Sequence, residues 1–84
     1  MEIYESARKH GIGDQDIRHA VDRALVVADE QATSTVLYLG PDRAGNLLEI
    51  VSVLRDDNTE IVIHAMRMRR IYESLLHRVG DPDE

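Results

Sequence analysis

The chain has 84 residues, the size of one small domain. Asp and Glu number 16 against 10 Lys and Arg, and this net charge of −6 disfavours a protein that binds nucleic acid through most of its surface. No cysteine is present, which excludes disulfide frameworks and thiolate metal sites. No stretch approaches the roughly 20 apolar residues that span a bilayer, and residues 1–11 lack the apolar core of a secretory signal. We therefore expect a cytoplasmic protein that has no membrane partner.

The first 27 residues are expected to be helical. Residues 1–10 carry apolar side chains at helical spacing. Gly13 is placed to cap a second helix, because two aspartates follow it in the first turn, where carboxylates favour the helix dipole. Apolar residues then recur at helical spacing from Ile17 to Leu25, so this helix should end near residue 26 or 27. Residues 26–29 alternatively form a short strand.

Residues 34–66 predict three antiparallel strands joined in order, which is a meander. Runs rich in Val, Ile and Leu are separated by two clusters of turn-forming residues, Gly40–Gly45 and Asp56–Asn58. After Ala65 the apolar spacing changes from strand-like to helical, which predicts a helix over residues 67–79 and a tail over residues 80–84. The whole chain is then one α+β domain, with N-terminal helices, a three- to four-stranded antiparallel sheet and a C-terminal helix.

A strand register follows if Asp57 and Asn58 form the tip of the second hairpin. This register pairs Ile50 with Ala65, Val51 with His64, Ser52 with Ile63, Val53 with Val62, and Leu54 with Ile61. Side chains alternate along a strand, so Glu49 and His64 should be diagonal neighbours on one face. The opposite face should be buried under the helices, and it contains Leu37, Leu48, Ile50, Leu54, Ile61 and Ile63.

Glu49 and His64 are candidates for acid–base chemistry. Imidazole titrates near neutral pH, so His64 suits the transfer of a proton, while Glu49 either orients it or acts as the base. Guanidinium groups suit phosphate oxygens, and the candidate phosphate-binding residues are Arg43, Arg67, Arg69 and Arg70. Each candidate also has a structural interpretation, such as a solvent-facing strand residue, a turn-binding Arg43, or an Arg69 or Arg70 paired with Glu73. No metal-ligand spacing is recognisable, so no metal or cofactor is expected.

Three short segments resemble the BrnT-type toxins, which are small RelE-like ribonucleases of bacterial toxin–antitoxin pairs. The segments are Lys9–Ile12 before an acid-led helix, Tyr38–Gly40 with Gly45–Val51, and Ile61–Arg67. The resemblance extends roughly from Ala7 to Arg78, although Met66 stands where the family has an arginine. It implies a RelE-like fold, metal-independent cleavage of RNA and a cognate antitoxin as protein partner. Lys9 and His10 match the family's opening, where they either cap the first helix or join the site.

Two other functions stay open. The first is a non-catalytic interaction module that binds a partner or homo-oligomerises through an open apolar sheet face. That face would contain Val36, Tyr38, Leu47, Val51, Val53, Val62 and Met66. The second is a DNA-binding regulator whose helix from Ile17 to Leu25 enters a groove. It is disfavoured, because only Arg18 and Arg23 could contact phosphates there, beside Asp16 and Asp22.

Overall fold

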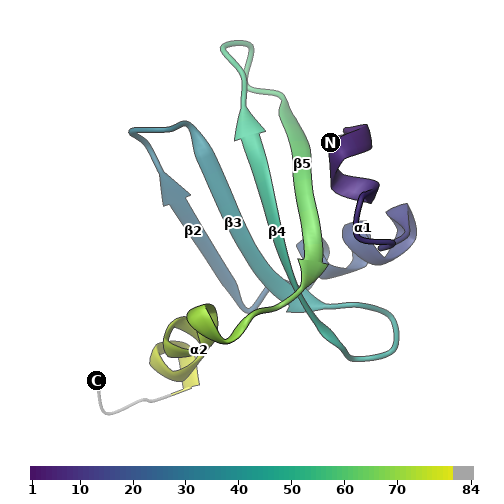
Figure 1. Cartoon of the computed structure of the whole chain (residues 1–84). Coiled ribbons are helices and arrows are strands. Elements are labelled where there is room, and N and C mark those ends of the chain that lie inside the picture. Colours follow the sequence, from purple (N-terminus) through teal and green to yellow (C-terminus); the bar gives the residue numbers. More distant parts are fainter. Residues whose placement is uncertain (81–84) are drawn as a thin grey trace.

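A five-stranded mixed sheet forms the centre of the computed structural model, which describes the backbone of residues 1–80 and the side chains of residues 1–77 (Figure 1). The strands are β1 (Glu2–Ile3), β2 (Val26–Glu30), β3 (Thr35–Pro41), β4 (Leu47–Leu54) and β5 (Glu60–Arg67), and they lie in the order β1-β5-β4-β3-β2. Strands β2 to β5 are antiparallel, whereas β1 runs parallel to β5. The α+β class and the meander are confirmed, and the sheet gains a strand at each edge. Residues 81–84 of the predicted tail lie outside the described residues.

The helix α1 (Asp14–Asp22) begins where the sequence predicts, with Gly13 as its N-cap. It ends earlier than expected. Arg23 leaves helical geometry at φ −115°, and the backbone N–H of Leu25 donates to the carbonyl of Leu39 at 2.8 Å. The chain therefore begins to pair with β3 while its apolar residues still follow helical spacing. The alternative prediction of a strand near residues 26–29 is confirmed.

The predicted helix over residues 1–10 is wrong. Its first residues form β1, and only Glu5–Arg8 turn, as the 3₁₀ helix η1. The backbone N–H of Tyr4 donates to the carbonyl of Val62 at 2.8 Å, and the Ser6 hydroxyl donates to the carbonyl of Ile63 at 2.7 Å. The N-terminal segment thus satisfies backbone groups at the edge of β5 that would otherwise lack partners.

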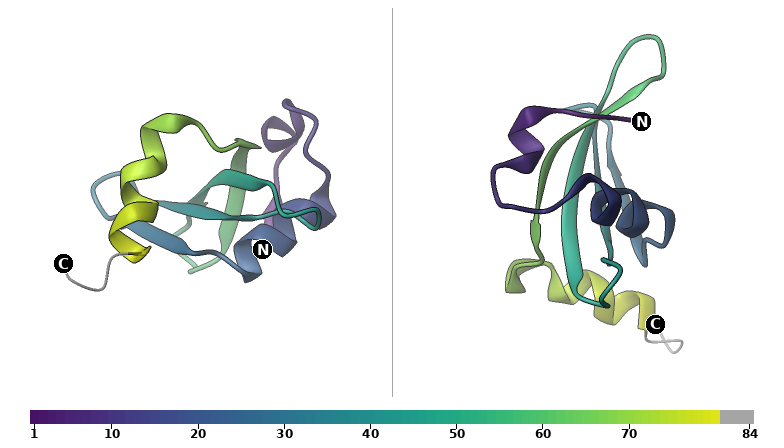
Figure 2. Two further views of the ribbon diagram at one scale, coloured as in Figure 1. Left: turned by 90° about the horizontal axis from the view of Figure 1, so that it is seen from below. Right: turned by 90° about the vertical axis from the view of Figure 1, so that its right-hand side faces the viewer.

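The C-terminal helix also starts later than predicted. Strand β5 continues to Arg67, the short 3₁₀ helix η2 (Arg70–Tyr72) follows, and α2 (Glu73–Gly80) completes the described chain. α1 packs against β3 and β4, while α2 crosses the end of the sheet at which β5 finishes (Figure 2). Neither helix, within the described residues, is both long and apolar enough to cross a bilayer.

The predicted register of the second hairpin is correct only in the half that lies away from the tip. Ile50 pairs with Ala65 and Val51 with His64, as predicted, but an irregularity follows between Val51 and Ser52. Ile63 is the extra residue on β5, so that Ser52 pairs with Val62, Val53 with Ile61, and Leu54 with Glu60. The cause is a three-residue tip over residues 56–58, closed by a bond from the N–H of Arg55 to the carbonyl of Thr59 at 2.9 Å. The bulge compensates for the odd residue in the turn.

This register changes which side chains are buried. The core under α1 includes Leu48 and Ile50, as predicted. It also contains Val36, Tyr38 and Val62, so the expectation that these three lie on an open face is wrong. The other four residues that were predicted to be buried under the helices are not buried there. Leu54 is 37% exposed, Leu37 and Ile63 are half-buried, and Ile61 is buried but pairs with Val53 on the face opposite α1.

Candidate active site

Glu49 is the centre of the candidate site. It lies on the sheet face opposite α1, in the row formed with Leu39 and Met66, and it is completely buried. One carboxylate oxygen lies 2.9 Å from Nε2 of His64, which confirms that these two side chains are neighbours. The same carboxylate accepts from Arg69, through the backbone N–H at 2.9 Å, Nε at 3.0 Å and Nη2 at 2.7 Å. A buried charge is tolerated when it is paired and hydrogen-bonded in this way.

The contacts of Glu49 decide between the two roles that the sequence leaves open for it. Burial acts to raise the pKa of the carboxyl, but the hydrogen bonds from Arg69 and His64 outweigh it, and the pKa falls below the ordinary value of 4.5. The same ion pair raises the pKa of Arg69. Glu49 is therefore an ionised acceptor whose oxygens are all occupied, which suits it to orient His64 and makes it a poor base.

Arg69 occupies the junction between β5 and η2. It is the N-cap residue of η2, in extended geometry, so its backbone N–H and its side chain both reach Glu49. The guanidinium also lies over the ring of Tyr72, 5.9 Å from the centroid. Half of the Arg69 side chain stays exposed, so the cation borders solvent although its partner is buried.

His64 combines a buried partner with an accessible ring. Its Nε2 faces Glu49 and its side chain is 28% exposed, so Nδ1 is the ring nitrogen that does not contact the carboxylate. The ring of His10 contacts it edge-to-face, with centroids 5.7 Å apart and an interplanar angle of 75°. Sequence reasoning left His10 as either a helix cap or a site residue. The structure brings it to the site. The sequence signals were its place in the segment Lys9–Ile12 and beside Gly11, the glycine of a turn at φ +79°.

The predicted arginine cluster is only partly assembled. Arg69 is in the site, and Arg70 follows it as an exposed residue of η2. Arg67 pairs with Leu48, so its side chain belongs to the row that faces α1 rather than to the row of Glu49. Neither Arg67 nor Arg70 forms an ion pair with another described residue. The predicted pairing of Arg69 or Arg70 with Glu73 is replaced by the pairing of Arg69 with Glu49.

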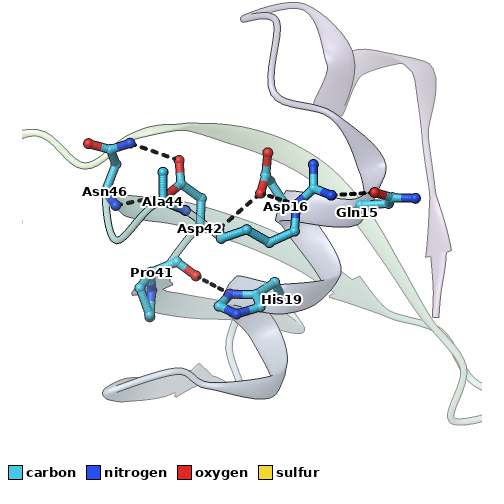
Figure 3. Close-up of polar contacts among 8 residues, drawn as sticks. Gln15, Asp16, His19, Pro41, Asp42, Ala44 and Asn46 are labelled. Atoms are coloured by element: carbon cyan, nitrogen blue, oxygen red, sulfur yellow. Dashed lines mark hydrogen bonds and ion pairs between the residues drawn. The ribbon is translucent and has the colours of Figure 1, made fainter.

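Arg43 lies elsewhere, because its partners Asp16 and Gln15 belong to α1. Figure 3 shows these two partners beside Asp42, Ala44 and Asn46 of the β3–β4 turn. The Nε and the backbone N–H of Arg43 both donate to one oxygen of Asp16, at 2.8 Å and 3.0 Å, and its Nη1 donates to Gln15. Nearby, Nδ1 of His19 lies 2.8 Å from the carbonyl oxygen of Pro41. These contacts fasten the β3–β4 turn to the start of α1, so Arg43 is held by a structural pairing.

The candidate partner-binding residues divide between the two faces. Leu47, Val51, Val53 and Met66 are half-buried on the face that carries Glu49, whereas Val36, Tyr38 and Val62 are core residues. The Tyr38 hydroxyl donates to Glu60 at 2.6 Å, and burial, together with this carboxylate, raises the pKa of Tyr38 to about 12. Ser52 donates to the same oxygen at 2.6 Å. Tyr38 therefore stabilises the core.

No group of three or more His, Asp or Glu side chains is arranged to hold a metal ion in the described part of the chain. Compared with protein-family models, curated proteins and solved structures, the chain matches none of them.

Proposed function

We propose that this protein is a small metal-independent endoribonuclease in which His64 is the general base. The observation that carries the proposal is the buried carboxylate of Glu49, which holds a partly exposed histidine and a half-exposed arginine at the same point of the sheet surface. RNA brings its own nucleophile, the 2′-hydroxyl, so its cleavage needs proton transfer and cations but no metal ion.

The proposed reaction begins with a neutral His64 whose Nε2–H donates to Glu49. Nδ1 then takes the proton of the 2′-hydroxyl, and the 2′-oxygen bonds to the adjacent phosphorus. The bond from phosphorus to the 5′-oxygen breaks as that oxygen takes up a proton. The negative Glu49 stabilises the imidazolium that forms, as a carboxylate does in hydrolytic triads. The cation of Arg69 stabilises charge on the phosphoryl oxygens, and the products are a 2′,3′-cyclic phosphate and a 5′-hydroxyl.

The charge distribution around the site supports an anionic substrate. The chain is acidic overall, yet Arg69 and Arg70 are adjacent at the exit of β5. In the proposal Arg70 binds a phosphate that neighbours the scissile one. The BrnT-like sequence segments favour the same activity, and with it a RelE-like fold and silencing by a cognate antitoxin.

The test separates proton transfer from phosphate binding. His64→Ala should slow cleavage of a fluorogenic RNA by about 10²–10⁴-fold, the span for one acid–base group, and leave RNA affinity nearly unchanged. Arg70→Ala should weaken RNA binding and lower the slope of log affinity against log salt by about 0.7, the value for one phosphate contact on a single strand.

Arg43→Ala is the matched control, because this arginine is held by Asp16 on the other side of the sheet and should change neither measurement. Circular dichroism of each variant establishes that it is folded. A His64→Ala protein with the wild-type rate would remove His64 from the mechanism. Wild-type protein that leaves RNA intact would refute the proposed activity.

A second function, a non-catalytic interaction module, is favoured by the uncovered part of the sheet. Leu37, Val51 and Val53 are half-buried apolar residues on the face away from α1. Sedimentation at high protein concentration tests the self-association that this face would mediate. A protein that stays monomeric and also binds no protein expressed from a neighbouring gene would contradict the interaction function.

A further inference from the structure

His10 and His64 form a pair of histidines, although they come from opposite ends of the chain. Their rings meet edge-to-face at 5.7 Å between centroids, close enough for both to reach one phosphodiester group. His64 has a carboxylate partner, whereas His10 is exposed and forms no ion pair with the described residues. The two imidazoles therefore differ in environment, which is the usual basis for dividing acid and base roles between like groups.

The segment that carries His10 is held in position from both sides. Ser6 donates to the carbonyl of Ile63, next to His64, at 2.7 Å. Arg8 and Asp14 then close the segment with two bonds, at 2.9 Å and 2.8 Å, while Gly11 supplies the left-handed turn between them. An exposed ion pair of this kind contributes little to stability. Its main effect is geometric, because it fixes the loop that presents His10 to β5.

We propose that His10 is the general acid that protonates the leaving 5′-oxygen of RNA. This inference rests on the proposed ribonuclease function. His64 is the better base, because Glu49 stabilises the imidazolium that it becomes, so His10 is left to donate. As the bond from phosphorus to the 5′-oxygen breaks, that oxygen takes the proton of the His10 imidazolium. His64 has then gained one proton and His10 has lost one. Hydrolysis of the cyclic phosphate, with the two roles reversed, returns both histidines to their starting protonation states.

Two substrates with different leaving groups test this role. Uridylyl-3′,5′-adenosine expels an alkoxide that needs a proton, whereas uridine 3′-(4-nitrophenyl phosphate) expels a stable phenolate. His10→Ala should slow cleavage of the dinucleotide by about 10²–10⁴-fold and that of the aryl ester by less than about tenfold. His64→Ala should slow both reactions. His77→Ala, at an exposed histidine of α2, is the matched control and should slow neither.

The outcomes separate this inference from the function on which it rests. A His10→Ala enzyme that loses both reactions equally, or neither, would overturn the acid role while the ribonuclease function stands. Wild-type protein that cleaves neither substrate would overturn both proposals. The contact itself has a readout that does not need activity. The ring-proton resonance of His64 should shift in folded His10→Ala protein, because the ring current of the edge-to-face neighbour is lost, and an unshifted resonance would refute the pairing.

Discussion

Replacing Glu49 with Gln tests whether the buried carboxylate holds the site together. The amide keeps one oxygen, which still accepts from the backbone N–H of Arg69. Its nitrogen takes the place of the oxygen that lies 2.7 Å from Nη2 of Arg69 and 2.9 Å from Nε2 of His64. The N–H groups of the amide then face the N–H groups of the Arg69 guanidinium, whereas His64 can adapt by exchanging its tautomer. The change thus removes the charge and one charge-assisted hydrogen bond while conserving shape.

The expected loss is large for a chain of this size. Breaking a buried ion pair costs about 3–5 kcal/mol, and the lower value applies because half-exposed Arg69 can turn to water. A domain of 84 residues has a free energy of unfolding of roughly 4–13 kcal/mol. A loss of about 3 kcal/mol should lower the melting temperature by about 12–24 °C.

Thermal unfolding followed by circular dichroism at pH 7 measures this loss. Asp56→Asn is the control, because it removes the same charge from an exposed hairpin tip, where changes usually stay within about 0.5 kcal/mol. The pKa of Glu49 is lowered in the folded protein, so its stabilising effect is complete above the ordinary value of 4.5 and disappears as the pH falls through the lowered value. The difference between wild type and Glu49→Gln should therefore narrow in acid. Equal melting temperatures at pH 7, or a difference that does not depend on pH, would refute this account.

Two further substitutions test the packing on the α1 side of the sheet. A Cβ at Gly40 would overlap the backbone carbonyl of Ala20, so Gly40→Ala should cost about 1–3 kcal/mol in thermal unfolding, whereas Gly13→Ala, where the space is open, should cost less. Equal losses would contradict the close approach of α1. Leu48→Ala should cost about 2–5 kcal/mol because Leu48 is fully buried, whereas Leu54→Ala should cost under about 1 kcal/mol at its exposed position. Equal losses of unfolding free energy in urea would show that the β-bulge is assigned to the wrong position.

The contact between Glu49 and His64 could be predicted because it depends on local rules, whereas the pairing of Arg69 with Glu49 was not predicted. Two turn clusters and the alternation between them define β4 and β5, and these place Val51 opposite His64. Glu49 follows as a diagonal neighbour of His64, and Arg69 lies just past the end of the same strand. The partner of Arg43 could not be predicted, because Asp16 lies on a helix whose docking angle depends on tertiary packing.

Two predictions were wrong, the register of β5 and the face on which Tyr38 lies. Both errors have physical causes that the residue pattern does not reveal. Ile61, Val62 and Ile63 are all β-branched and apolar, so a strand with or without the bulge shows the same hydrophobic pattern. In β3, large apolar residues stand on both faces, and alternation alone does not say whether Tyr38 or Leu37 faces α1. Gly40 carried the missing signal. A glycine inside a strand marks the close approach of another backbone, and Tyr38 shares its face.

The two-residue strand β1 forms the edge of the sheet beside β5 and leads into the segment that carries His10. Its pairing joins Glu2 to Ile61, the bond between Ser6 and Ile63 closes 57 residues of sequence, and Ile3 and Ala7 are buried in the core. A local opening of this edge would break these bonds and expose both apolar side chains. Such an opening would carry His10 away from His64 and leave Glu49, His64 and Arg69 in place. The protein would then pass between a site with two histidines and a site with one without unfolding, and a ligand that contacts both rings would be bound only while the edge is closed.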